Sequence, residues 1–438
     1  MGSLRFSIAC LFQEDLVREF TMKFFSFKKI VQRCTVVIFT STALIACDVI
    51  IDDTDENDNT GTDSTANCDA SSSGVNWDAL LTKNCQQLSG YNLFANSMDP
   101  TANPNAGGIP YDLSTALFTD YASKYRFVFI PGGSKINYSE HEVLDFPVGT
   151  VLVKTFSMPE DTAFRDGNER VIETRLLIHR ENGWVARPYY WGSIVDATLS
   201  ITGEEISEMT TIHNGEELEF TYSVPSAASC TSCHSVVPIL QSANDTRESI
   251  FKPIGPKSRF LNKDYDYGST VANQLVYWQQ LGVLNGLPSN NDEISQAASF
   301  SDLTDIDSLS TEELMDTAKS YLDVNCAHCH RSELTLPEPL YAGPAGGSGL
   351  QLEYNRGFED DPLKFGVCKT PVAGGHSDYS RDVVPLDPDD SYLLFRMSTI
   401  DERHKMPELG RAVVHAEGVA LIRRWIENLP EASCSPAS

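Results

Sequence analysis

The chain has 438 residues, with 33 Lys and Arg against 61 Asp and Glu, and a formal net charge of −28 at pH 7. Such acidity disfavours nucleic-acid binding, which needs a positive surface. Residues 1–47 carry a net charge of +3, so the remainder carries −31, which would attract a basic partner protein and repel an acidic one. The length is enough for two or three domains.

The N-terminus has the pattern of a bacterial export signal. A short Lys-containing segment precedes an apolar run that is too short for a spanning helix and ends in Leu-Ile-Ala-Cys47. That ending resembles a lipobox, so residues 22–47 are the predicted signal peptide and Cys47 the predicted lipidation site. Because Met22 is the better start, we interpret residues 1–21 as an upstream extension. An uncleaved N-terminal anchor is the alternative.

Two regions of different composition follow. Residues 48–75 are dominated by Asp, Asn, Thr and Ser as far as Ser73, and such a segment cannot bury a core, so they are predicted to form an acidic, disordered tether. Residues 76–225 are predicted to be β-rich, because turn residues separate short β-branched or aromatic runs at 126–130, 150–156, 170–179, 184–191 and 217–222. Runs that are apolar on both faces suit a β-sandwich. The Asn182-Gly183 pair predicts a hairpin.

Two pentapeptides carry the chemistry of the chain. Cys230-Thr-Ser-Cys233-His234 and Cys326-Ala-His-Cys329-His330 both have the C-x-x-C-H pattern of covalent haem c attachment. Two thiols at this spacing can add to the two vinyl groups of one porphyrin, and the adjacent His can then bind the iron. A zinc site would need two Cys pairs about 15–20 residues apart, and these lie far further apart. Two covalent haems are therefore predicted, with His234 and His330 as iron ligands.

Helical patterns occur after residue 225, in the predicted first haem region (226–300) and second haem region (301–438). One is predicted over 270–284. Ser310 and Glu313 form a capping box for a second helix that runs into Cys326. A third is amphipathic over 419–429 and stops at Pro430. Residues 337–388 are rich in Gly and Pro and predict a long loop insertion.

A helix that enters the second motif, Met406-Pro407 and a terminal helix containing Trp425 together resemble a class I cytochrome c domain. This resemblance implies that Met406 is the sixth iron ligand of the second haem, a thioether that raises the potential relative to a second His. The segments 88–94, 110–118, 146–156 and 173–179 extend the likeness to a family of bacterial two-haem c-type cytochromes, often encoded beside a parallel β-helix repeat protein. The expected fold is α+β and multidomain, with a β-sandwich-like N-terminal domain followed by a mainly α-helical, cytochrome c-like haem region.

The remaining iron ligands stay open. For the second haem the alternatives to Met406 are Met397, His376 and His404, while His328 lies inside the attachment loop and cannot reach the opposite face. For the first haem, the candidate ligands from the β region are His141, His179, His213, Met158 and Met209. The alternative is that this iron has no second protein ligand.

Four cysteines remain once the motifs, Cys47 and the two cysteines at or before the signal are set aside. An even remainder in an oxidising compartment suggests disulfides, with three possible pairings. We favour Cys68–Cys85 with Cys368–Cys434, because it needs no link between domains.

The sequence therefore predicts a lipid-anchored, two-haem electron carrier on the periplasmic side of a bacterial envelope, held at the inner or the outer membrane, with an unknown redox partner. No catalytic residue is predicted, because no nucleophile–base pair can be identified from spacing. The alternatives are a haem enzyme with an open first iron, such as a peroxidase, and a binding protein whose β domain captures a polymer or a partner.

Overall fold

The computed structural model describes residues 33–39, 42–48, 67–69, 74–165, 169–238, 248–331, 341–359, 361–372, 378–432 and 434. The chain divides into two compact units, residues 1–64 and residues 65–438. The described part of the first unit is an antiparallel pair of strands, β1 (Arg33–Phe39) and β2 (Thr42–Asp48), and the predicted lipidation site Cys47 lies in β2. Residues 1–21, the start of the predicted signal peptide and most of the predicted tether lie outside the described residues. None of the described helices has both the length and the hydrophobicity needed to cross a bilayer.

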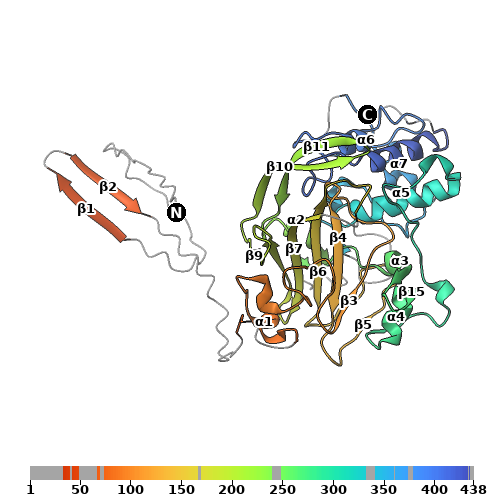
Figure 1. The fold of residues 1–438 in the computed structure, drawn as a ribbon. Helices are drawn as coiled ribbons and strands as arrows, with labels where there is room; N and C mark the ends of the chain where they lie inside the picture. The colour runs from red at the N-terminus through yellow and green to blue at the C-terminus, as the bar shows by residue number, and fades with distance from the viewer. Residues whose placement is uncertain are drawn as a thin grey trace. The chain divides into compact units, whose positions relative to one another are not determined.

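A six-stranded antiparallel sheet forms the centre of the second unit (Figure 1). Its strand order is β3-β4-β6-β7-β8-β9. The bounds of these strands are β3 Gly108–Pro110, β4 Ser123–Phe129, β6 Val151–Pro159, β7 Glu169–Arg180, β8 Gly183–Tyr190 and β9 Thr198–Leu199. The predicted hairpin is confirmed, because β7 and β8 are joined there and Arg180 pairs with Gly183.

Both faces of this sheet are buried. Phe127 and Val153 belong to the core on one face, which is covered by α1 (Trp77–Thr82) and the 3-10 turn η1 (Leu88–Tyr91). The neighbouring residues Val128 and Leu152 point to the other face, where they pack against α3 (Ser258–Leu261) and α4 (Gln274–Gln280). The alternation of side chains along each strand therefore supplies two separate cores.

A separate antiparallel pair, β10 (Glu204–His213) and β11 (Glu216–Val224), packs on the far end of β6 and β7. Buried Met158 and Ile172 of the sheet meet Met209 and Phe220 of this pair in a third core. Strand β5 (Ile136–Asn137) lies outside the main sheet and pairs in parallel with β16 (Leu284–Asn285).

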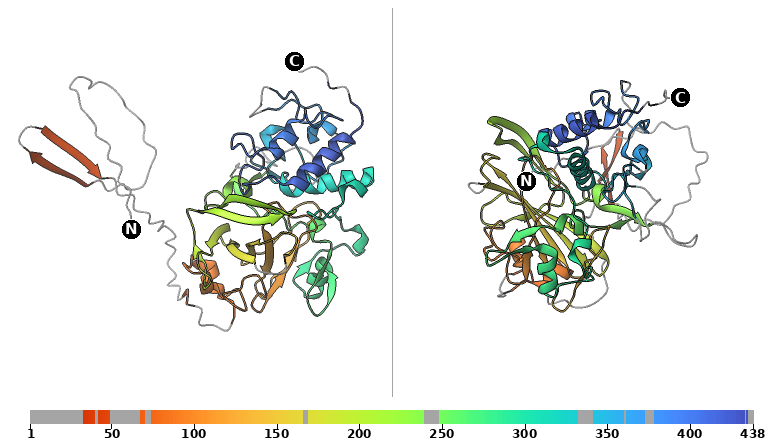
Figure 2. Two further views of the ribbon diagram at one scale, coloured as in Figure 1. Left: turned by 45° about the horizontal axis from the view of Figure 1, so that its top comes forward. Right: turned by 90° about the vertical axis from the view of Figure 1, so that its right-hand side faces the viewer.

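Short elements dominate the chain after residue 225. The helices there are α2 Thr231–His234, α3, α4, α5 Thr311–Asn325, α6 Tyr392–Ser398 and α7 Ala416–Glu427. The strands are β12 Ser235–Pro238, β13 Ile250–Phe251, β14 Asp264–Asp266, β15 Val271–Asn273, β16 and β17 Tyr341–Ala342. Helices α5, α6 and α7 gather at one end of the central sheet, beside β10 and β11 (Figures 1 and 2).

Helices α5 and α7 form where the sequence predicts them. Ser310 and Glu313 make the reciprocal hydrogen bonds of the capping box at the start of α5. Leu314, Ala318 and Leu322 on α5 pack in one core with Ile422 and Ile426 on α7. The predicted apolar faces of the two helices are therefore the faces that meet.

The predicted fold class is wrong in two respects. The described residues are 27% strand and 21% helix, so the haem region is not the mainly α-helical, cytochrome c-like region that the sequence suggested. Helical periodicity is confined to three separate segments there, and the Gly- and Pro-rich residues between them cannot continue a helix. The β region is not a sandwich of two sheets either, because α1 and η1 cover one face of the six-stranded sheet and α3 and α4 pack on the other, while the separate β10–β11 pair packs only at its end.

The helix predicted over 270–284 is also shorter than expected. Residues 271–273 form β15, and the Asn273 side chain accepts hydrogen bonds from Leu275 N and Val276 N, so it caps α4 at that point. Leu275 and Trp278 on α4 are buried, whereas Val271 and Leu281 at the two ends of the predicted segment are exposed.

Both disulfides of the favoured pairing are present. Cys68 is bonded to Cys85, and Cys368 to Cys434, whereas the four motif cysteines are free thiols. The Cys68–Cys85 bond joins the start of the compact unit to the core under α1, where Cys85 is buried.

Candidate haem-binding sites

The first motif forms one tight turn followed by a strand. Cys230 precedes α2, and His234 N donates a hydrogen bond to Cys230 O at 3.0 Å, which brings the ends of the pentapeptide together. His234 Nδ1 lies 2.7 Å from Lys252 O, and its ring stacks on Phe251 at 4.7 Å. Among the described residues, no group forms a hydrogen bond with His234 Nε2, so this nitrogen is left for a ligand.

The second motif continues directly from α5. Cys326 is the C-cap of that helix, and His330 N donates to Cys326 O at 2.8 Å. His330 Nδ1 lies 2.9 Å from Ser348 Oγ, which also accepts from Leu350 N. As in the first motif, Nε2 has no hydrogen-bond partner in the part of the chain that the structure describes.

Both motif histidines are held in the form that binds metals. Burial lowers the pKa of His234 to about 3 and the pKa of His330 to about 4. Each imidazole is therefore neutral at pH 7, with its orientation fixed through Nδ1. This arrangement is usual for a histidine that binds a metal through Nε2.

Each motif opens on its own cavity. Cys326 and His330 line a mainly apolar cavity of about 420 Å³, here called the 326–330 cavity. Cys230, Cys233 and His234 line a cavity of about 180 Å³, the 230–234 cavity. The first volume falls within the usual range for sites of small molecules and cofactors, and the second is smaller.

The two cavities adjoin each other. Phe118, Asn325 and Pro407 line both of them. The two motifs also meet directly, because the Sγ atoms of Cys233 and Cys329 and a ring nitrogen of His328 all lie within 4.8 Å of one another. Their separation in sequence does not keep them apart in space, so the argument from spacing against one shared metal site fails. A structural zinc site needs four ligands, however, and this cluster offers three.

The structure brings Met406 to the second motif. Met406 and Met397 both line the 326–330 cavity together with His330. Met397 is otherwise buried in the core between α5 and α7. His404 does not line this cavity; its Nδ1 lies 3.4 Å from Tyr392 Oη. His376 lies outside the described residues.

None of the five ligand candidates for the first haem lines the 230–234 cavity. His141 is near the Glu140 carboxylate at 3.9 Å, and His179 binds Phe146 O through Nδ1. Met158 and Met209 are both buried in the core below β10 and β11. His213 belongs to the polar network described next.

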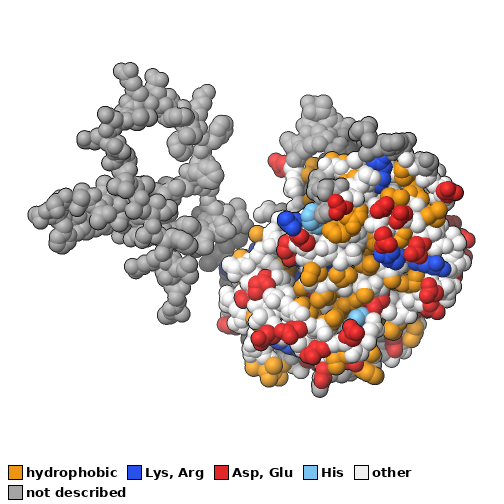
Figure 3. Space-filling view, turned by 90° about the horizontal axis from the view of Figure 1, so that it is seen from above, with side chains coloured by type: hydrophobic (Ala, Val, Ile, Leu, Met, Phe, Trp, Pro, Cys, Tyr) orange, Lys and Arg blue, Asp and Glu red, His pale blue; other side chains and the backbone are white. Residues whose placement is uncertain are grey.

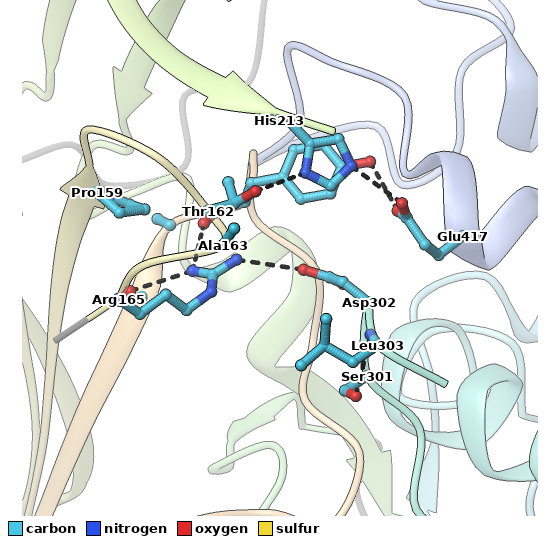
Figure 4. A network of polar contacts seen from close by, with 12 residues as sticks. Pro159, Thr162, Ala163, Arg165, His213, Ser301, Asp302, Leu303 and Glu417 are labelled. Carbon is cyan, nitrogen blue, oxygen red and sulfur yellow. Dashed lines mark hydrogen bonds and ion pairs between the residues drawn. The ribbon is translucent and has the colours of Figure 1, made fainter. Parts of the chain in front are cut away.

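A partly buried polar network joins the β region to α7 (Figure 4). His213 Nε2 lies 3.0 Å from Glu417 Oε1, and Thr162 Oγ1 lies 2.8 Å from His213 Nδ1. Asp302 accepts from Arg165 at 3.2 Å and lies 3.2 Å from His415 Nε2. Both ring nitrogens of His213 are therefore used in contacts within the protein, which indicates a structural role for this residue.

The network reaches the cavity through His415. His415 Nδ1 lies 3.0 Å from Tyr321 Oη, and both residues line the 326–330 cavity. Burial opposes ionisation of Asp302, but the hydrogen bond from His415 and the charges of His415 and Arg165 lower its pKa below the ordinary value. The network therefore fixes the wall of this cavity to the central sheet.

Sequence reasoning missed one residue of the first site, His328. It belongs to the second motif but lines the 230–234 cavity, and its Nδ1 is buried with no hydrogen-bond partner among the described residues. The sequence feature that could have indicated His328 is the extra histidine inside Cys-Ala-His-Cys-His, because covalent haem attachment does not require it.

No protein-family model, no curated protein and no solved structure matches this chain.

Proposed function

We propose that this protein is a two-haem c-type cytochrome that passes electrons between redox partners, tethered by a lipid at Cys47 to the periplasmic side of a bacterial envelope. When bound, each haem supplies an iron that changes reversibly between two oxidation states. Cys230 and Cys233 would hold one haem, with His234 on its iron. Cys326 and Cys329 would hold the other, with His330 and Met406 on its iron.

One observation carries the proposal. In both motifs, the histidine next to the second cysteine lines a cavity and has Nδ1 engaged, by Lys252 O in one and Ser348 Oγ in the other, while Nε2 forms no hydrogen bond with any residue that the structure describes. The four motif cysteines are free thiols, whereas the other two described pairs form disulfides. Free thiols beside a pre-oriented imidazole are what covalent attachment requires, so the donor groups of each motif fit a haem, while the 230–234 cavity of about 180 Å³ must widen to hold one.

The adjoining cavities support passage of electrons between the two sites. Phe118, Asn325 and Pro407 line both cavities and therefore form a shared boundary between the two sites. The resemblance to bacterial two-haem cytochromes agrees with this role, although the haem region does not have the predicted helical fold.

The surface favours a basic redox partner. Acidic side chains are scattered around apolar surface on the face shown in Figure 3, which is consistent with a net charge of −28. Complementary charge increases association rates more than it increases affinity. A partner with a basic docking face would therefore associate faster at low ionic strength.

Counting the haems tests the proposal. The chain is produced in cells that attach haem c, and bound haem is measured after denaturation, where only covalent haem stays with the protein. We expect two haems per chain, one in Cys230→Ala/Cys233→Ala and one in Cys326→Ala/Cys329→Ala. Cys68→Ala/Cys85→Ala is the matched control and keeps both. A chain that carries zinc and no iron would contradict the proposal and would point to the cluster of Cys233, His328 and Cys329.

A second candidate function is a haem enzyme whose first iron is open. The observation that favours it is that none of the five predicted ligands lines the 230–234 cavity. An open iron would give a high-spin signal that changes when cyanide or peroxide is added. If both irons are low-spin and their spectra do not change when cyanide or peroxide is added, electron transfer remains the proposed function.

A further inference from the structure

Three basic side chains form a row across the central sheet. Arg126 on β4 lies directly opposite Lys154 on β6, and Lys154 lies directly opposite Arg175 on β7. Like charges at directly opposite positions destabilise an antiparallel pair. A row of three such positions therefore calls for compensating negative charge.

The two outer members of the row have that charge. Arg126 donates to Asp112 at 2.6 Å, and Arg175 forms a two-pronged ion pair with buried Glu173, with both N–O distances 2.7 Å. Both arginines are therefore paired with a carboxylate, although Arg126 shares Asp112 with Lys263 at 3.3 Å.

Lys154, in the middle, has no such partner. Its Nζ makes no hydrogen bond or ion pair with any described residue, and its one specific contact is the face of the Phe156 ring, 4.6 Å from the ring centroid. A cation over a Phe ring recovers only part of what the ammonium loses on leaving water. Among the described residues, Lys154 is thus the member of the row with no carboxylate bonded to it, and Glu173 acts on it only through its charge while it is bonded to Arg175.

The unpaired ammonium belongs to the 230–234 cavity. Lys154 and Arg175 line its wall together with Cys230, Cys233 and His234, and no Asp or Glu is among the described residues of that wall. Arg187 lines it too, but its guanidinium donates to Asn84. In a chain with 61 acidic residues against 33 basic ones, a cavity with basic side chains and no carboxylate is unexpected.

Removal from water makes the Lys154 ammonium costly. It lowers the pKa of Lys154 well below the ordinary value, and the neighbouring charges of Arg126, Lys124 and Arg175 lower it further, while the Glu173 carboxylate, which is paired with Arg175, opposes them. An anion bound in the cavity would remove this penalty, because it would supply the counter-charge that the fold leaves out.

We propose that Lys154 and Arg175 form an anion-binding site in the wall of the 230–234 cavity, which takes a carboxylate or another small oxyanion beside the first motif. Two sources could supply that group. One is a propionate of the haem at Cys230 and Cys233, an arm that rests on the proposed function. The other is a free anion from solution.

Lys154→Gln tests the propionate arm, with Lys154→Arg as the matched control. In Lys154→Gln we expect two haems per chain and unchanged spin states, but a lower midpoint potential at one haem and no change at the other. The reason is that removal of a nearby positive charge disfavours the reduced, less positive iron. Lys154→Arg keeps the charge and should restore the wild-type potential.

Calorimetry with formate tests the free-anion arm and does not depend on haem. If a free anion is the ligand, we expect saturable binding to the wild-type chain that weakens about tenfold or more in Lys154→Gln, because hydrogen bonds to charged groups are among the strong ones. Neutral formamide, of similar size, should not compete. Saturable binding identifies a free anion as the ligand, and its absence together with the shift in potential identifies the propionate.

Two results would overturn the anion site. The first is that Lys154→Gln leaves formate binding unchanged and, in a chain that carries haem, also leaves both midpoint potentials unchanged. The second is conversion of one haem to high spin in Lys154→Gln, because Lys154 would then be an iron ligand through its neutral amine. A chain that binds formate at Lys154 but carries no haem would refute the proposed function and leave the anion site standing.

Discussion

The Sγ atoms of Cys233 and Cys329 lie within 4.8 Å of each other, although the two cysteines belong to different motifs. In the proposed function, each of these two sulfur atoms is covalently bonded to a different haem. An electron that arrives at one iron would then change the electrostatic potential at the other. Two unit charges about 10 Å apart interact by about 1–2 kcal/mol at an effective dielectric constant of about 20.

The first prediction concerns this interaction. We expect the redox titration of the wild-type chain to differ from the sum of the titrations of the two single-haem variants, Cys230→Ala/Cys233→Ala and Cys326→Ala/Cys329→Ala. The second electron should enter at a lower potential than the same haem shows alone, because the first electron repels it. If the two single-haem curves add up to the wild-type curve, the two sites do not interact.

The second prediction separates the two methionines of the 326–330 cavity. Met406→Ala should convert the second haem to a high-spin form, because the proposed sixth ligand is removed. Met397→Ala should leave the spin state unchanged and lower the free energy of unfolding by about 2–5 kcal/mol, because Met397 is buried between α5 and α7. Absorbance and electron paramagnetic resonance spectra give the spin states. Reversed results would make Met397 the ligand.

Local sequence patterns predicted the elements but not their partners. The capping box at Ser310 and Glu313 is a short-range pattern, since both of its hydrogen bonds lie within four residues, and it therefore predicted the start of α5 correctly. The residues that orient the motif histidines have no such pattern. Lys252 acts through its backbone oxygen, which every residue possesses, and Ser348 is one serine in a Gly-rich loop.

The contact between the two motifs also could not be predicted from the sequence. It depends on the packing of the segment after Pro225 against the end of α5, which joins residues that are distant along the chain. The same holds for the row of Arg126, Lys154 and Arg175, since alternation along a strand predicts which side chains share a face but not the register between strands. His328, which lines the 230–234 cavity, was missed because this histidine was considered only for its position within the second motif and not for a contact with the first.

The third prediction tests how Ser348 acts on the second haem. The Ser348 hydroxyl lies 2.9 Å from His330 Nδ1, and a group that accepts a hydrogen bond from Nδ1 makes the imidazole a stronger donor to a metal at Nε2. A stronger donor favours oxidised iron, so Ser348→Ala should raise the midpoint potential of the second haem only. Exposed Ser398, at the end of α6, provides the control variant Ser398→Ala, which should change neither potential. A fall in potential would show that the hydroxyl donates the hydrogen bond.

The last prediction concerns a buried ion triad that ties α3 to α5 just before the second motif. Asp323 is 1% exposed, and its carboxylate accepts from Lys257 Nζ at 2.9 Å and from Arg259 Nε at 3.1 Å. Asp323→Asn would leave both cations buried without a full counter-charge, which typically costs about 3–5 kcal/mol. Urea unfolding at pH 7 should show a loss of this size.

The same triad predicts how stability depends on pH. Burial opposes ionisation of Asp323, but Arg259 and Lys257 outweigh it and hold its pKa well below the ordinary value. A depressed pKa in the folded state gives stability that is fully present above the unfolded pKa of about 4 and is lost as pH falls through the folded value. The wild-type chain should therefore lose more stability than Asp323→Asn between about pH 5 and pH 3. The exposed pair of Asp389 and Arg423 supplies the control, since Asp389→Asn should leave the unfolding midpoint at pH 7 unchanged. Equal losses in the wild-type chain and in Asp323→Asn would show that another carboxylate governs the acid limb.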